Sequence, residues 1–398
     1  MNPLSNPFSP GAGNQPPELA GRAHLLRQVE ILLARIKAGR SEQSMFMVGL
    51  RGVGKTVLLN RVREIAQTQG YQAVMIEAHE NKSLPQLLLP QLRQTLFALD
   101  RMQDVSQKVK RGLRVLRSFI GAVKVKVGDA EFGLDIDAET GAADSGDLEA
   151  DLAELFVAVG EAAADRSTAV AIIIDELQYL TEVEMSALIM AIHRVAQRGL
   201  PLVLIGAGLP QLVGLAGKSK SYAERLFTYP EVGALSMEDA AQALQGPVTS
   251  QGISFTPEAL VEVHRVTQGY PYFLQEWGYQ SWNLAAHSPI DLALIQQTTV
   301  SSTERLDSSF FRVRFDRLTP REKDYLCALA EMGTGNQRSG GVAERLGVRV
   351  QTIAPLRSSL IKKGMIYSPA HGDTAFTVPL FDQFMLRTMP NGPRKAVA

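Results

Sequence analysis

Short, almost wholly apolar runs alternate with longer stretches of helical periodicity through the first half of the chain. Buried strands are predicted at residues 44–48 (SMFMV), 73–77 (AVMIE), 169–176 (AVAIIIDE) and 201–206 (PLVLIG). Helical spacing of apolar residues predicts helices at about residues 19–37, 55–70, 84–99, 147–164 and 185–197. Strands that are apolar throughout and separated by helices predict an α/β fold, with a parallel sheet covered on both faces.

The strand pattern stops after about residue 235. Helix-start signatures at Ser236 and at Thr256-Pro257 introduce a region that is helical to about residue 306, and a capping box at Thr319 opens a further module. The first 17 residues, rich in Pro, Gly and Asn, predict a flexible arm. The predicted divisions are an arm (1–17), an α/β domain (18–235), a helical domain (236–308), a C-terminal module (309–390) and a tail (391–398).

The C-terminal module resembles a winged helix-turn-helix. Helices are predicted at residues 342–346 and 352–363, with Gly347 at the turn and a strand pair at 367–378 centred on Gly372. In DNA-bound modules of this type the third helix enters the major groove. Its outward positions would be Gln351, Ala354, Pro355, Ser358 and Lys362, a set poor in arginine for reading bases. Candidate phosphate contacts are Arg338, Arg345, Arg349, Lys362 and Lys363. Double-stranded DNA and protein docking both remain open.

An insertion at about residues 102–146 has two parts. Its helix places Val109, Leu113, Leu116 and Ile120 on one face and several cations on another, and the following segment alternates around Gly128-Asp129 as a β-hairpin does. One interpretation is a surface that follows a nucleic-acid backbone. The other is a solvated face balanced by acids of the hairpin, namely Asp129, Glu131, Asp135 and Asp137. Both remain open.

Composition narrows the class of protein. The 398 residues are 45% apolar and 21% charged, with 41 basic and 41 acidic side chains, so no net field favours nucleic acid or acidic lipid. Cys327 is the single cysteine, which excludes an internal disulfide and fits the cytoplasm. The six histidines show no metal-ligand spacing. No signal peptide or membrane span is indicated.

The first predicted strand is followed by the sequence GLRGVGKT, which contains Gly49, Gly52 and Gly54. Glycine permits backbone conformations that let N–H groups converge on an anion next to the start of a helix. Lys55 would reach the β- and γ-phosphates of ATP, and the Thr56 hydroxyl would bind Mg²⁺. The residues expected to line this phosphate loop are Gly49, Leu50, Arg51, Gly52, Val53, Gly54, Lys55, Thr56 and Val57.

The strongest buried-strand signal ends in Asp175-Glu176. Ligands of open α/β sheets bind outside the carboxyl ends of the strands, where this acidic pair is expected. Asp175 would hold the Mg²⁺ that Thr56 also touches, and Glu176 would orient or deprotonate the attacking water. The alternative is a solvated acidic turn, but the apolar strand before it and the intact phosphate loop favour a nucleotide site.

With both motifs in place, residues 18–305 resemble an AAA+ or STAND-type P-loop ATPase, near the origin-initiator-like ATPases. The resemblance implies the strand order 5-1-4-3-2, a helical lid and an ATP-dependent homo-oligomer. "ELAGR", ending at Arg22, resembles the family motif that precedes the first helix and lies near the adenine. Pro271 in "GYPYF" resembles a lid motif whose proline region contacts the nucleotide base. Arg225 corresponds to an arginine finger acting on a neighbouring subunit, with a surface helix residue as the alternative.

Two departures from that family bear on function. The fourth strand ends in Gly206-Ala207-Gly208 where a polar sensor is usual, and Gln211 is the nearest polar candidate. The lid has no evident sensor arginine. The resemblance therefore implies a slow ATPase in which nucleotide state acts as a switch, associated with DNA. The alternative is a signalling or defence scaffold that recruits a protein effector.

Overall fold

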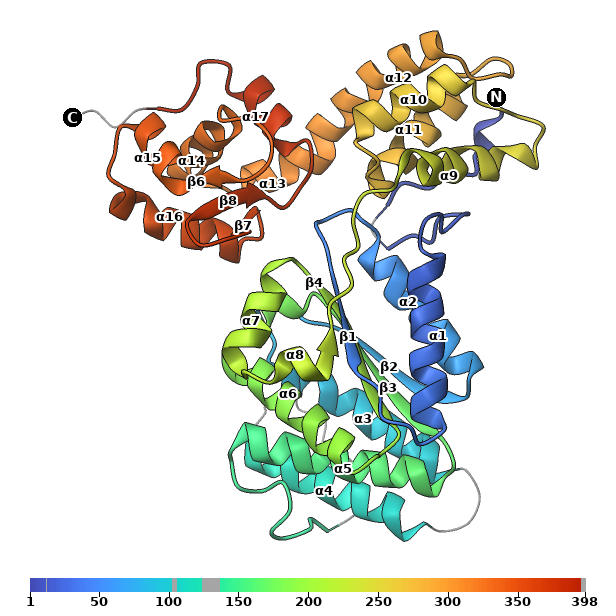
Figure 1. The fold of residues 1–398 in the computed structure, drawn as a ribbon, viewed down its shortest axis with the longest axis vertical. Helices are drawn as coiled ribbons and strands as arrows, with labels where there is room; N and C mark the ends of the chain where they lie inside the picture. The colour runs from blue at the N-terminus through green and yellow to red at the C-terminus, as the bar shows by residue number, and fades with distance from the viewer. Residues whose placement is uncertain (12, 102–105, 124–136, 395–398) are drawn as a thin grey trace. The chain divides into compact units, whose positions relative to one another are not determined.

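The computed structural model describes residues 1–11, 13–101, 106–123 and 137–394 (Figure 1). The predicted hairpin around Gly128 lies outside them. Contacts divide the chain into two compact units. The α/β unit comprises Ala23–Gly49 and Lys55–Glu231, and the helical unit comprises Met1–Arg22, Leu50–Gly54 and Val232–Ala398. Each is described by itself. Over the described ranges, no helix combines the length and apolar character needed to cross a membrane.

The α/β unit is built on a parallel sheet of five strands. These are β1 (Ser44–Val48), β2 (Tyr71–Glu77), β3 (Ala169–Asp175), β4 (Leu202–Gly208) and the short β5 (Phe227–Thr228). Their order is β2-β3-β4-β1-β5, which confirms the predicted order. Every residue of β1, β3 and β4 is buried, as the unbroken apolar runs predicted. All four strands expected from the pattern are present, and their parallel pairing brings their carboxyl ends to one edge.

Helices cover both faces of this sheet (Figure 1). They are α1 (Ala23–Lys37), α2 (Lys55–Thr68), α3 (Leu84–Asp100), α4 (Gln107–Val123), α5 (Leu148–Asp165), α6 (Glu182–Gln197), α7 (Gln211–Ser219) and the single turn α8 (Ala223–Leu226). A 3₁₀ turn, η2 (Leu177–Tyr179), follows β3. α1 and α2 lie on one face, and α3, α5 and α6 lie on the other.

The basic helix of the insertion, α4, packs on α3 and α5. Its predicted apolar face is buried at Val109, Leu113 and Leu116. Three of its cations form ion pairs with two acids that follow it in the sequence. Lys108 and Arg111 contact Glu161 at 3.0 and 3.1 Å, and Glu139 pairs with Arg111 at 2.9 Å and with Arg114 at 3.6 Å. Three of the cations are thus neutralised by Glu139 and Glu161, which the sequence had not indicated as partners.

The helical unit contains the expected lid helices. These are α9 (Met237–Thr249), α10 (Pro257–Thr267), α11 (Pro271–Leu284) and α12 (Leu292–Arg305), followed by the π-helical turn η3 (Leu306–Phe311) and α13 (Arg312–Asp316). Ser236 and Thr256 cap α9 and α10 through their side chains, as their sequence signatures predicted. The buried core is continuous from these helices into the C-terminal module.

The first residues of the chain pack on α11 instead of forming a free arm. The Phe8 ring is buried against Gly278, where an added Cβ would lie 2.7 Å from the ring. Trp282 Nε1 donates to the Asn2 carbonyl at 2.9 Å, and Asn6 Nδ2 donates to the Tyr279 carbonyl at 3.0 Å. This segment was expected to be flexible because it is rich in Pro and Gly, but its one large aromatic side chain anchors it.

The C-terminal module alternates helices with a small antiparallel sheet. Its elements are α14 (Pro320–Ala330), β6 (Gln337–Arg338), α15 (Ser339–Leu346), α16 (Val350–Lys362), β7 (Ile366–Tyr367), β8 (Asp373–Phe376) and α17 (Phe381–Thr388), with sheet order β6-β8-β7. Gly347 and Gly372 have φ of 67° and 82° at the expected turns. The α16 side chains expected to face outward are exposed, namely Gln351, Ala354, Pro355, Ser358 and Lys362. α17 was not predicted.

Candidate nucleotide-binding site

The loop after β1 has the backbone that its glycines were expected to allow. Gly52 and Gly54 have φ of 82° and 90°, a region closed to most side chains. Helix α2 then begins at Lys55, so its first N–H groups, which have no partner within a helix, adjoin the loop. A helix start preceded by left-handed glycines suits an anion.

The two motifs meet in the α/β unit. Thr56 Oγ1 donates to Asp175 Oδ2 at 2.5 Å, although the two residues are 119 positions apart in the chain. Lys55 is 6% exposed and its Nζ donates to the Gly49 carbonyl at 2.9 Å. Burial raises the pKa of Asp175 above its usual range, and the hydrogen bond from Thr56 opposes that shift.

A hydroxyl and a carboxylate in contact fit Mg²⁺, because this ion takes oxygen ligands and is usually held by one or two protein groups together with phosphates. Among the residues that the structure describes, no group of three His, Cys, Asp or Glu side chains is placed to hold a metal. A Mg²⁺ site built on Thr56 and Asp175 would be of the open, few-ligand kind.

Glu176 directly follows β3 in a left-handed backbone conformation, with φ 54° and ψ 38°. Its N–H donates to Asp175 Oδ1 at 2.8 Å. Such a conformation is uncommon for a residue with a long side chain, and it occurs preferentially at functional sites. The side-chain carboxylate accepts a hydrogen bond from Gln178 Nε2.

Close packing against η2 explains why glycines occupy positions 206 and 208 at the end of β4. A Cβ on Gly206 would lie 2.2 Å from Leu177 Cδ1, and one on Gly208 would lie 2.8 Å from Gln178 Oε1. Both neighbours belong to η2, so a larger side chain at Gly206 would collide with Leu177 and one at Gly208 would have to displace the Gln178 amide. Gln211, the candidate from the sequence, starts α7, and its buried Oε1 has no hydrogen-bond partner in the described structure.

In the helical unit, Arg22 and the start of α11 contact loop residues. Arg22 Nη2 donates to the Val53 carbonyl at 3.4 Å and also to the Gly233 carbonyl. Burial lowers the pKa of Arg22. Pro271 is the first residue of α11, and the N–H of the next residue, Tyr272, donates to the Gly52 carbonyl at 3.2 Å. These residues adjoin the loop, and their predicted contact with the nucleotide base stays a prediction.

Arg51 is set apart from the other loop residues. Its N–H donates to the Thr377 carbonyl at 3.0 Å and its Nε to the Gly364 carbonyl at 3.3 Å, both in the C-terminal module. An N–H that donates to a carbonyl is not directed at a phosphate. Arg314 of α13 is a nearby cation that the sequence did not single out, because nothing in its local pattern marks it. Burial lowers its pKa to about 10, and the charge of Arg51 adds to the shift.

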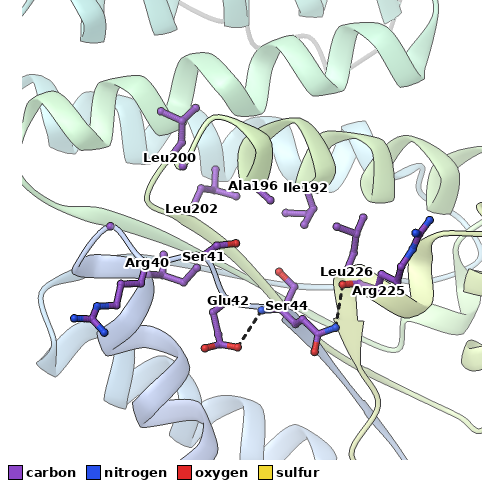
Figure 2. Close-up of a pocket in the computed structure, with 14 residues that line it drawn as sticks. Arg40, Ser41, Glu42, Ser44, Ile192, Ala196, Leu200, Leu202, Arg225 and Leu226 are labelled. Atoms are coloured by element: carbon purple, nitrogen blue, oxygen red, sulfur yellow. Dashed lines mark hydrogen bonds between the residues drawn. The ribbon is translucent and has the colours of Figure 1, made fainter.

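Arg225 lies at the opposite edge of the sheet from the loop. It precedes β5, whose Phe227 pairs in parallel with Ser44 at the start of β1, whereas the loop follows the end of β1. Five strand residues span roughly 16 Å at about 3.3 Å each. Figure 2 shows Arg225 beside a pocket of about 340 Å³ at this edge, with its side chain directed away from Glu42 and Ser44.

Comparison with known families and structures supports the nucleotide-site interpretation. Residues 18–205 match the family described as AAA ATPase domain, and residues 308–385 match a domain of unknown function, DUF8462. The Walker-type ATPase PABY2304 of Pyrococcus abyssi is similar in structure, with 16% identity, 93% of this chain and 97% of that chain covered, and a TM-score of 0.59. That similarity shows the fold.

Two further solved structures are more distant. They are the Aeropyrum pernix ORC1 protein in complex with DNA (15% identity, 94% of each chain, TM-score 0.46) and Cdc6p of Pyrobaculum aerophilum (13% identity, 98% of each chain, TM-score 0.46). No curated protein sequence matches this one. The segment that matches the AAA ATPase domain family thus includes both motifs, the glycine loop and the acidic end of β3.

Proposed function

We propose that this protein binds and hydrolyses Mg·ATP and uses its nucleotide state as a molecular switch. The observation that carries the proposal is the 2.5 Å contact between Thr56 and Asp175, which brings the two motifs together in one site. In this proposal Lys55 binds the β- and γ-phosphates, and Thr56 and Asp175 hold Mg²⁺. When bound, Mg²⁺ neutralises charge that develops on the phosphates.

Glu176 acts on the water in this scheme. A carboxylate at the carboxyl end of a strand, next to the metal ligand Asp175, is suited to accept a proton from the attacking water or to orient it. The absence of room for a polar side chain on β4 supports slow turnover, because one of the usual polar contacts to the phosphate is missing there. A slow ATPase holds each nucleotide state long enough to act as a switch.

Assembly is part of the proposal. Arg225 lies at the edge of the sheet opposite the loop, so it is too far away to reach a phosphate bound to its own subunit. It acts as a finger only on ATP in a second copy of the chain. An arginine there stabilises charge that develops on the γ-phosphate. The active form is accordingly an ATP-dependent homo-oligomer.

Arg225→Ala is therefore expected to lower the steady-state ATPase rate roughly 10- to 100-fold, below the largest effects known for such fingers, with ATP affinity nearly unchanged. Mixing it with Glu176→Gln should restore activity, because one interface then carries an intact Glu176 and an intact Arg225. Arg40→Ala is the matched control, since Arg40 lines the same pocket and is exposed. If the ATPase rate per chain of the parent does not change with protein concentration, and mixing the two variants restores no activity, Arg225 is not an arginine finger.

The C-terminal module is proposed to be a winged helix that binds double-stranded DNA. Support comes from its element order and from the exposed outer face of α16. The opposing observation is that Arg338, Arg345 and Lys363 are paired with Asp373, Glu331 and Glu322. This pairing favours the second candidate function, a signalling or defence scaffold whose module docks on a protein. Within the described chain, Arg349 and Lys362 form no such pair.

Salt dependence of DNA binding separates the two candidates. Binding of a short duplex should weaken between 50 and 200 mM salt, with a logarithmic slope of about −0.9 for each phosphate contacted. The double variant Arg349→Ala, Lys362→Ala should reduce that slope by about 2, whereas Arg345→Ala, already paired with Glu331, should change it little. Fluorescence anisotropy measures both. No retention at 50 mM salt would favour the scaffold.

A further inference from the structure

We propose that Gln178 positions the Glu176 carboxylate for its reaction with water. The inference rests on the proposed ATPase function and assigns a role to a residue that neither motif includes. Gln178 is the second residue of η2, the 3₁₀ turn that follows Glu176. It acts through Glu176 and is therefore a positioning residue.

The Gln178 amide is held at both ends. Its Oε1 accepts a hydrogen bond from the Leu209 N–H at 2.9 Å, and its Nε2 donates to Glu176 Oε2. A backbone N–H only donates, so the amide oxygen must face Leu209 and the NH₂ must face the carboxylate. The orientation of the amide is thus determined by its surroundings, and the donor that it presents to Glu176 is not interchangeable with the acceptor.

The packing of η2 against β4 leaves space for the contact between Gln178 and Glu176. Leu177 lies so close to Gly206 that a Cβ there would be 2.2 Å from its Cδ1, and Gly208 leaves room for the Gln178 amide. Because positions 206 and 208 are glycines, there is space beside β4, and the side chains of Leu177 and Gln178 occupy it. The left-handed backbone of Glu176 is uncommon, and a fixed hydrogen-bond partner determines which way its side chain points.

The contact also links Glu176 to the phosphate loop. Gln178 is bonded to Leu209, which follows Gly208 in the chain, and the Gly208 carbonyl accepts a hydrogen bond from the Gly49 N–H at 3.1 Å. The Gly49 carbonyl in turn accepts from Lys55 Nζ. These hydrogen bonds, together with the backbone that joins them at Gly208-Leu209 and Gly49, connect the carboxylate with Lys55.

A structural role alone would make a different prediction from a positioning role. Gln178→Glu has nearly the same shape and keeps an acceptor for the Leu209 N–H, but it replaces the donor that faces Glu176 with a second carboxylate. If the amide merely fastened η2 to β4, this variant would behave like the parent. If it positions Glu176, turnover falls although the bond to β4 is kept. Gln178→Ala removes both bonds.

The test compares steady-state ATP turnover with two readouts that do not depend on turnover, the calorimetric affinity for Mg·ATP and the melting temperature. Gln178→Glu and Gln178→Ala should each lower kcat roughly 10- to 100-fold, with the KM and the affinity for ATP within about twofold of the parent. Gln197→Ala, which removes an exposed glutamine at the end of α6, is the matched control and should retain parental kcat.

Each outcome decides between the interpretations. Parental kcat in Gln178→Glu would overturn the positioning role, and so would a loss of ATP affinity that matches the loss of kcat, since that indicates a damaged binding site. Loss of kcat in Gln211→Ala but not in Gln178→Ala would transfer the role to Gln211. If the parent itself binds ATP but shows no turnover, both the proposed hydrolysis and this inference fail. Turnover in the parent with an unaffected Gln178→Glu removes the inference alone.

Discussion

Glu176→Gln is expected to retain bound ATP while its turnover falls about 100-fold or more. Glutamine has the shape of glutamate but lacks the carboxylate that accepts a proton from water or orients it. The substitution leaves Asp175 and Thr56 in contact, because the hydrogen bond from residue 176 to Asp175 comes from its backbone N–H, which glutamine keeps. Phosphate release measures turnover, and filter retention of labelled ATP measures binding.

A matched control keeps this result interpretable. Glu182 is an exposed carboxylate at the start of α6, in the same unit, and Glu182→Gln should hydrolyse ATP at the parental rate. Phosphate release at the parental rate from Glu176→Gln would show that another group activates the water. In that case Asp175-Glu176 would be retained as a metal site only.

The sheet and both motifs were predictable because their signals are local. A run such as Ile172-Ile173-Ile174 is apolar throughout only when both faces of its strand are covered, and β3 is buried along its whole length. The loop and the acidic pair each lie within a few consecutive residues. Once the strands are parallel, their carboxyl ends meet at one edge, so Thr56 and Asp175 come together without further information.

Features that depend on tertiary contacts were not predictable. Gln178 follows an acidic pair and has no marked pattern, and its importance depends on how closely η2 approaches β4. The acids that pair with α4 are Glu139, in the segment before α5, and Glu161 of α5. Phe8 was one apolar residue in a segment rich in Pro and Gly, yet its burial against Gly278 holds that segment in place. Local periodicity contains none of these contacts.

Arg225 illustrates a different limit. It precedes β5, and the parallel pairing of β5 with β1 puts it at the amino edge of the sheet. Whether an arginine at that edge meets a phosphate depends on a second copy of the chain. The structure of one chain shows which residues are exposed to a second copy. Mixing Arg225→Ala with Glu176→Gln tests whether Arg225 acts on ATP bound to that copy.

Lys55→Ala is expected to abolish nucleotide binding, because the lysine is the compact cation that the loop presents to the β- and γ-phosphates. Lys55 is 6% exposed, and its Nζ is held beside the loop by the Gly49 carbonyl. Charge-assisted hydrogen bonds to phosphate are among the stronger polar contacts. A loss of roughly 3 kcal/mol in binding free energy, equivalent to about 100-fold in Kd, is the smallest effect expected.

The direct test of the central claim is isothermal titration calorimetry of Mg·ATP into the parent protein, Lys55→Ala and the control Lys218→Ala, which removes an exposed lysine of α7. Melting temperatures of the three proteins establish that each is folded. The account predicts one saturable site for each chain in the parent and in Lys218→Ala, and no measurable binding to Lys55→Ala. Unchanged affinity in a folded Lys55→Ala protein would contradict the nucleotide site at this loop.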